Sequence, residues 1–118
     1  MSEDKSLNKV KGAYGEDMAC QYLLDHGQKI VARNYQCRFG EVDLITTQAQ
    51  VLHFVEVKNR STDLVPGRYA VNHNKQKHIR NVAMYFLTQY PNYRDWVICF
   101  DVIEITDGQI DYLENCFY

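Results

Sequence analysis

The chain has 118 residues, of which 46% are hydrophobic and 24% are charged, and its net charge is −2. This length suits one domain over residues 1–118 and excludes two separate cores. The slight negative charge argues against a protein that coats nucleic acid indiscriminately. No stretch reaches the apolar length of a membrane span, and residues 1–11 lack the apolar centre of a signal peptide, so we expect a cytoplasmic protein. The four dispersed cysteines contain no CxxC pair and indicate neither a zinc ribbon nor a disulfide framework.

The first predicted element is a helix over residues 13–25 that ends at Gly27 and follows a flexible tail over residues 1–11. Ala19, Cys20 and Leu23 form its apolar side, and Glu16 lies in the middle of that side. A carboxylate there requires a cationic partner, a metal ion or a raised pKa. The alternative is a glutamate in the first helical turn, favoured by the helix dipole, that reaches back to solvent.

Strands are predicted over residues 28–37 and in a hairpin over residues 40–60, whose turn lies at 47–50. The hairpin strands contain the charged residues Asp43, Glu56 and Lys58, although their pattern is otherwise apolar. With Gln48 and Ala49 at the tip, Asp43 lies opposite Phe54 and diagonal to Glu56. A register two residues further on places Asp43 directly opposite Glu56. The two carboxylates converge in both registers.

Two carboxylates on neighbouring strands repel each other unless a proton or a cation lies between them. Oxygen ligands suit a hard ion such as Mg²⁺, which also binds substrate phosphate. Lys58 shares the strand face of Glu56, where we expect it to orient or activate the attacking water or to neutralise charge in the transition state. This pattern predicts metal-assisted phosphodiester cleavage. The alternative is an edge ion pair with no catalytic role.

A second helix is predicted over residues 72–89, after an exposed loop at 61–69. Its apolar stripe, extended one turn toward the N-terminus, reaches Lys75, which projects into a cavity above the sheet or snorkels to solvent. The segment 58–80 carries a net charge of +5, against −7 for the remainder. This charge indicates phosphate binding or, alternatively, a solvated basic helix face. The candidate residues for nucleic-acid binding are Arg60, Arg68, Lys75 and Lys77.

Two further strands are predicted, an internal one over residues 96–105 and an edge strand over 110–113. Asp101 interrupts the first of them, and we expect it to have a structural partner. The order αβββαββ gives an α/β sandwich with a mixed central sheet flanked by helices, in which 96–105 lies beside 51–58. This arrangement brings five charged residues toward one end of the sheet: Glu16, Asp43, Glu56, Lys58 and Lys75.

Several segments together resemble the bacterial YraN-like family. They are Gly15-Glu16 with Ala19, Arg33-Asn34-Tyr35, GEVDLI at 40–45, FVEVKNR at 54–60, Lys75 with Ala83, and FDV at 100–102. That family is similar to the restriction-endonuclease-like, PD-(D/E)xK superfamily, which includes Holliday junction resolvases. The resemblance implies that Asp43, Glu56 and Lys58 are the catalytic motif residues. It also implies that Glu16 matches the acidic position on the first helix and Lys75 the basic position on the later helix. It also implies Mg²⁺ or Mn²⁺ as cofactor, with the carbonyl of Val57 as a further ligand.

The sequence departs from these patterns at Val42, where the superfamily often has proline, and at Asn59, where the YraN-like family often has threonine. The main hypothesis is a metal-dependent endonuclease that hydrolyses DNA phosphodiester bonds in branched or single-stranded DNA, and a homodimer follows by analogy alone. A second is a non-catalytic module that holds nucleic acid for a DNA repair or recombination partner. A third is a structural protein in which the charges form an internal ion network.

Overall fold

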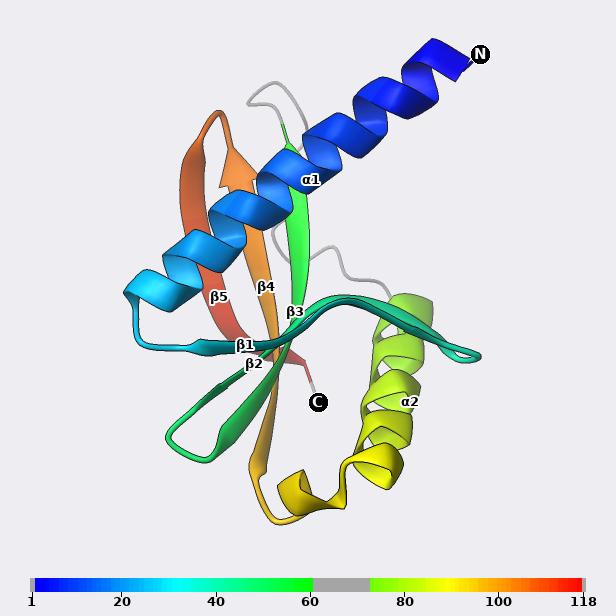
Figure 1. The fold of residues 1–118 in the computed structure, drawn as a ribbon, viewed down its shortest axis with the longest axis vertical. Helices are drawn as coiled ribbons and strands as arrows, with labels where there is room; N and C mark the ends of the chain where they lie inside the picture. Colours follow the sequence, from blue (N-terminus) through cyan, green and yellow to red (C-terminus); the bar gives the residue numbers. More distant parts are fainter. Residues whose placement is uncertain (1, 61–72, 118) are drawn as a thin grey trace.

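The computed structural model describes residues 2–60 and 73–117. The elements follow in the order α1 (Ser2–Asp25), β1 (Lys29–Cys37), β2 (Gly40–Gln48), β3 (Val51–Arg60), α2 (His73–Gln89), the short 3₁₀ helix η1 (Pro91–Tyr93), β4 (Val97–Thr106) and β5 (Gln109–Phe117) (Figure 1). The predicted order of helices and strands is confirmed. The loop predicted at 61–69 lies outside the described residues.

The sheet has five strands in the order β1-β2-β3-β4-β5. Neighbouring strands are antiparallel except β3 and β4, which are parallel. The sheet is therefore mixed, as predicted, with the late strand β4 beside the hairpin strand β3 and with β5 at the edge. Together with the two helices it makes an α/β fold.

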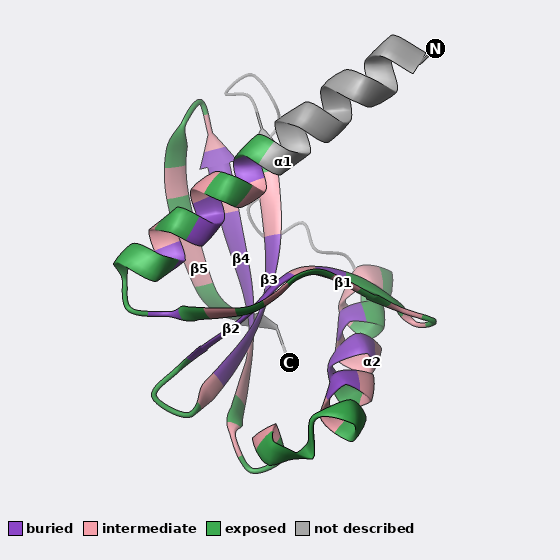
Figure 2. Ribbon diagram, in the orientation of Figure 1, coloured by how far each residue is buried: buried purple, intermediate pink, exposed green. Residues whose placement is uncertain are grey.

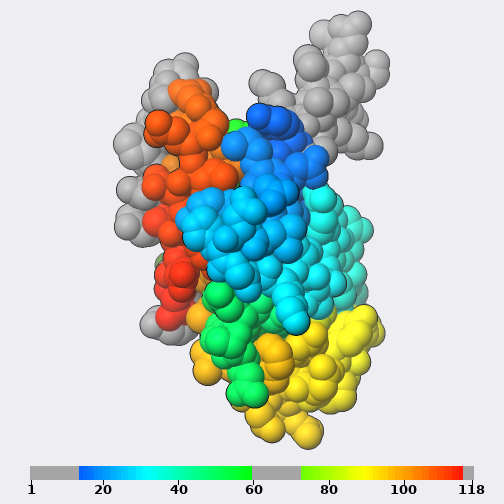
Figure 3. Space-filling model, turned by 60° about the vertical axis from the view of Figure 1, so that its left-hand side comes forward, coloured from blue at the N-terminus to red at the C-terminus, as the bar shows by residue number. Residues whose placement is uncertain are grey.

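The two helices cover opposite faces of this sheet. Successive residues of a strand point to opposite faces, and here they pack in two different hydrophobic cores. Phe54 packs with α2 residues such as Phe86, whereas Val55 packs with α1 residues such as Leu23. Figure 2 shows these buried segments where the helices meet the strands. From another side, the described part of α1 lies between β1 and β5 (Figure 3). The central strands are thus buried on both faces.

The hairpin turn sets the register of β2 against β3. Ala49 and Gln50 both have positive φ values, 52° and 62°, and Gln48 pairs with Val51. These values match a two-residue hairpin turn that requires left-handed backbone at both positions. The tip is therefore Ala49–Gln50 and not Gln48–Ala49. This is the second of the two expected registers, and when it is continued one position past the pair of Leu44 and Val55 it brings Asp43 opposite Glu56.

The helix α1 begins at Ser2, earlier in the chain than the predicted start at residue 13, and the flexibility expected of residues 1–11 stays a prediction. Residues 2–12 lack apolar periodicity, but a helix requires only its own backbone hydrogen bonds and can extend beyond its packed part. The helix ends as predicted at Asp25, shortly before Gly27, whose φ is 88°. β5 is also longer than predicted, because after a register shift beyond Leu113 its pairing with β4 resumes at Phe117, opposite Phe100. No helix within residues 2–60 and 73–117 is long and apolar enough to cross a membrane.

Candidate active site

Asp43 lies where β2 and β3 separate. Regular pairing between the two strands reaches Leu44 and Val55. One position further, Oδ2 of Asp43 accepts a hydrogen bond from the backbone N–H of Val57 at 2.8 Å. Burial raises the pKa of the Asp43 carboxyl, although the Val57 hydrogen bond and the nearby charges of Lys75 and Lys58 act in the opposite direction. The carboxylate is therefore fixed at the fork between the strands in a poorly solvated position.

Glu56, on β3, is the most buried of the candidate acids. The residue is only 5% exposed, and its Oε1 has no hydrogen-bond partner among the described residues. Burial, followed by the charge of Asp43, raises the pKa of Glu56 to about 7. A buried carboxylate oxygen without a donor carries a large desolvation cost. Glu56 therefore offers an unused ligand atom beside a second carboxylate.

Two lysines act on these acids from different elements. Nζ of Lys75, in the first turn of α2, lies 3.3 Å from Oε2 of Glu56. Lys75 therefore lies over the sheet, as the apolar stripe of the helix predicted, although its side chain remains 42% exposed. Lys58 shares the strand face of Glu56, and its charge lowers the pKa of both Asp43 and Glu56. The two ammonium groups partly offset the repulsion between the carboxylates.

Glu16 approaches the same fork from α1. Its side chain is mostly buried, and Oε1 has no hydrogen-bond partner in the described part of the chain. Burial raises the pKa of Glu16, a hydrogen bond from Asn34 and the charge of Arg33 lower it, and the charge of Asp43 raises it. Oε1 lies 3.8 Å from Nη2 of Arg33, which binds Asp17 more closely, at 2.8 Å. Glu16 is thus an electrostatic neighbour of Asp43 and is only weakly paired.

Gly15 allows α1 to lie close to the end of β3. A Cβ atom at position 15 would lie 3.3 Å from Nδ2 of Asn59, near the end of β3. Such a contact is tighter than ordinary van der Waals packing, so glycine allows the helix to approach the strand. The close approach carries the neighbouring Glu16 toward the site.

The candidate nucleic-acid-binding residues are less completely described. Lys77 is exposed on α2. The side chain of Arg60, and Arg68 altogether, lie outside the described residues. Val57 donates its N–H to Asp43, and the role of its carbonyl as a metal ligand remains a prediction.

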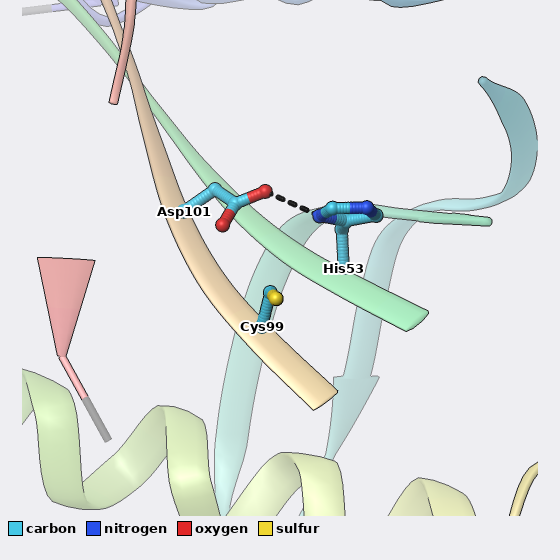
Figure 4. Close-up of side chains that lie close together, drawn as sticks. All are labelled: His53, Cys99 and Asp101. Carbon is cyan, nitrogen blue, oxygen red and sulfur yellow. Dashed lines mark hydrogen bonds and ion pairs between the residues drawn. The ribbon is translucent and has the colours of Figure 1, made fainter. Parts of the chain in front are cut away.

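Sequence reasoning missed a second polar cluster, on β3 and β4. Nδ1 of His53 lies 2.6 Å from Oδ2 of Asp101, and one ligand atom from each of His53, Cys99 and Asp101 lies within 4.8 Å of the others (Figure 4). Asp101 has a structural partner, as expected, but neither His53 nor Cys99 was predicted to belong to a site. Only the parallel register, which pairs His53 with Cys99, brings these residues together.

The fold and the site define an α/β protein in which carboxylates and lysines from three segments gather where two strands of a mixed sheet separate. Comparison with known proteins places the chain in a family. Residues 15–105 match the uncharacterised protein family UPF0102, and the chain belongs to this family, in agreement with its YraN-like resemblance.

Several UPF0102 proteins are similar along almost their whole length. The chain is 34% identical to one from Thermodesulfovibrio yellowstonii, over 91% of this chain and 95% of the relative. It is 40% identical to one from Alkaliphilus oremlandii, over 94% and 100% of the two chains. It is 41% identical to one from Nocardia farcinica, over 90% and 87%. The similarity therefore extends over most of this chain and most of each relative.

Proposed function

We propose that the protein is a divalent-metal-dependent endonuclease that hydrolyses DNA phosphodiester bonds, built on a restriction-endonuclease-like fold. The observation that carries this proposal is the state of Glu56. The carboxyl group is buried, one oxygen lacks a hydrogen-bond partner among the described residues, and the charge of Asp43 acts on it directly. If the charged residues formed only a structural ion network, we would expect this oxygen to accept a hydrogen bond within it. A cation between the two carboxylates would satisfy it and remove their repulsion.

The donor set fits a hard cation. Asp43 and Glu56 offer carboxylate oxygens, the Val57 carbonyl is a third candidate, and Mg²⁺ prefers oxygen ligands while retaining some of its waters. Mn²⁺ is accepted by the same kind of site. Glu16 also has a buried oxygen without a hydrogen-bond partner in the described residues and would hold a metal-bound water or a second ion. The bound ion supplies Lewis-acid stabilisation of charge on the phosphate.

The lysines then have separate roles. Lys58 lies on the face of Glu56, and its proposed role is to orient the attacking water and to offset negative charge that develops on the phosphate. Lys75 already contacts Oε2 of Glu56 at 3.3 Å, so it orients this carboxylate and leaves Oε1 for the cation. Arg60, Arg68 and Lys77 extend the positive charge along the substrate, where contacts to the phosphate backbone give affinity without reading sequence.

A second candidate is a non-catalytic nucleic-acid-binding module that acts with a DNA repair or recombination partner. One observation favours it. The ion pair between Lys75 and Glu56 neutralises the buried carboxylate without a metal ion. In this case the basic segment binds DNA and the acids only support the fold.

Nuclease assays separate the two functions. The protein is incubated with single-stranded, duplex and branched DNA in Mg²⁺, in Mn²⁺ and in EDTA. The nuclease proposal expects metal-dependent cleavage that Glu56→Gln and Lys58→Ala each reduce at least about 100-fold, a loss typical of general acid–base groups. Lys29→Ala is the matched control, because this exposed lysine pairs with Thr47 near the opposite end of β2.

Undiminished cleavage by Lys58→Ala would refute the role given to Lys58. If none of the substrates is cut, but DNA is bound in a salt-sensitive way that neither variant alters, the binding module is correct and the nuclease proposal fails.

A further inference from the structure

The cluster of His53, Cys99 and Asp101 lies away from the carboxylate fork, on the α1 face of the sheet. The three residues alternate with the Phe54 and Phe100 side chains that pack against α2, so they point to the other face. Parallel pairing places His53 beside Cys99 and Val55 beside Asp101. In Figure 4 the three side chains approach one another from two adjacent strands. They present an imidazole nitrogen, a thiol sulfur and a carboxylate oxygen, all within 4.8 Å of one another.

The Asp101 carboxylate is held in place by its neighbours. The hydroxyl of Tyr112 donates to Oδ2 at 2.5 Å, and the backbone N–H of Asn115 donates to Oδ1 at 2.8 Å. Gln28 in turn donates from Nε2 to the Tyr112 hydroxyl at 3.0 Å. Metal-binding residues are commonly oriented by such outer hydrogen bonds. The carboxylate therefore has a fixed orientation that does not depend on His53.

The cluster contains a buried negative charge. Asp101 is fully buried, and Nδ1 of His53 lies 2.6 Å from its Oδ2. The buried negative charge of the Asp101 carboxylate favours a cation at this position. A buried carboxylate also gains most from a partner of full positive charge.

We propose that His53, Cys99 and Asp101 form a binding site for a divalent transition-metal ion of the zinc type, separate from the site at Asp43 and Glu56. Thiolate and imidazole ligands select such ions over Mg²⁺. A tetrahedral Zn²⁺ site has ligand distances of about 2.0–2.3 Å, which separates the ligand atoms by roughly 3.3–3.8 Å. The distance of 2.6 Å between Nδ1 of His53 and Oδ2 of Asp101 therefore increases slightly on binding, and the Cys99 sulfur lies within 4.8 Å of both atoms.

The three ligands determine which protons the protein releases or keeps when the metal ion binds. Binding releases the thiol proton of Cys99 to solvent, and the neutral His53 ring carries its proton on Nε2 when Nδ1 holds the ion. Cys99 is only partly buried, so the ion and a water as fourth ligand reach the site beside it. The two negative ligands balance the charge of a divalent ion. The site is therefore electrically neutral when filled.

Cobalt provides the test, because Co²⁺ bound to a thiolate gives a near-ultraviolet charge-transfer band. The full-length chain, reduced with a phosphine and freed of metal, is titrated with Co²⁺ and then with Zn²⁺. We expect one equivalent of Co²⁺ to produce the band and Zn²⁺ to displace it. Cys99→Ser should abolish the band and weaken Zn²⁺ binding at least about tenfold. Cys37→Ser is the matched control, since Cys37 is also a free and partly buried thiol on a strand.

His53→Gln provides a second variant, with circular dichroism to verify that each protein is folded. Loss of Zn²⁺ affinity in both Cys99→Ser and His53→Gln, with the control unchanged, supports the site. Absence of stoichiometric binding by the folded wild-type protein would overturn it, and so would a band that survives Cys99→Ser. Neither result depends on nuclease activity, because the readout is metal binding at residues outside the carboxylate fork.

Discussion

The ammonium nitrogen of Lys75 lies 3.3 Å from Oε2 of Glu56. This contact joins the first turn of α2 to the middle of the sheet. The Glu56 side chain is almost fully buried, whereas that of Lys75 is 42% exposed. The lysine therefore keeps much of its hydration while it offsets the charge of the acid. This contact allows a carboxylate to remain beside Asp43, and it gives the first prediction.

Replacing Lys75 with methionine should raise the pKa of Glu56 above its value of about 7. The charge of Lys75 and its hydrogen bond both lower this pKa, so their removal leaves burial and Asp43 to act alone. Carbon-detected NMR titration of the Glu56 carboxyl measures the change. Lys77→Met is the control, because Lys77 is exposed on the same helix. A Glu56 pKa that is the same in Lys75→Met and Lys77→Met would contradict the ion pair.

Glu56→Gln should stabilise the metal-free protein at alkaline pH. The pKa of Glu56 in the folded protein, about 7, exceeds its ordinary value of 4.5, so ionisation weakens the fold. This cost is complete above about pH 7 and disappears as the pH falls through 4.5. The variant should therefore exceed the wild type at pH 8 by on the order of 1–3 kcal/mol in free energy of unfolding. The difference should shrink at pH 5.

Urea denaturation in EDTA at both pH values tests this prediction. Asp25→Asn is a suitable control, since Asp25 is an exposed acid that bonds only to Gln21 in its own helix. An advantage of Glu56→Gln that is equally large at pH 5 and pH 8 would show that ionisation is not its cause.

Two substitutions of Asp43 separate its charge from its hydrogen bond. Asparagine and alanine both remove the charge, but only asparagine retains an oxygen that accepts from the N–H of Val57. Leaving that N–H unpaired should make Asp43→Ala less stable than Asp43→Asn by about 1–3 kcal/mol. Chemical denaturation at one pH measures the difference. Equal stability of the two variants would mean that the hydrogen bond at the fork contributes nothing.

Tyr112→Phe tests the hydrogen bonds that hold Asp101. The substitution removes the hydroxyl that donates to Oδ2 and also leaves the amide of Gln28 without this partner. We expect a loss of about 1–3 kcal/mol in free energy of unfolding, because a buried acceptor loses a donor. Tyr14→Phe, at an exposed tyrosine of α1, should cause almost no change in the same thermal or chemical denaturation.

Much of the fold could be predicted because local patterns are strong. The apolar stripe of Ile79, Val82 and Phe86 predicted α2 and the direction of Lys75. Charges inside apolar strands pointed to Asp43 and Glu56 as an unusual pair. The hairpin tip could not be predicted, since Ala49 and Gln50 are not the glycine or asparagine that usually signal positive φ.

The second cluster could not be predicted for a different reason. His53 and Asp101 are 48 residues apart and meet only because β3 and β4 pair in one particular parallel register. Neither strand contains a turn or a charge pattern that specifies this register relative to the other. Contacts of this kind depend on the packing of the whole sheet, whereas the Asp43 and Glu56 pair depends on a single hairpin.

Calorimetric titration of Mg²⁺ and Mn²⁺ at pH 8 tests most directly whether Asp43 and Glu56 hold a metal ion. The measurement uses Cys99→Ser as the background, so that the transition-metal cluster does not contribute. Three substitutions are each combined with this background, namely Asp43→Asn, Glu56→Gln and the control Asp25→Asn. Saturable binding that the control retains and that both site variants weaken at least about tenfold is the predicted result. Equal affinity in all four proteins, or no saturable binding in the background protein, would contradict the account.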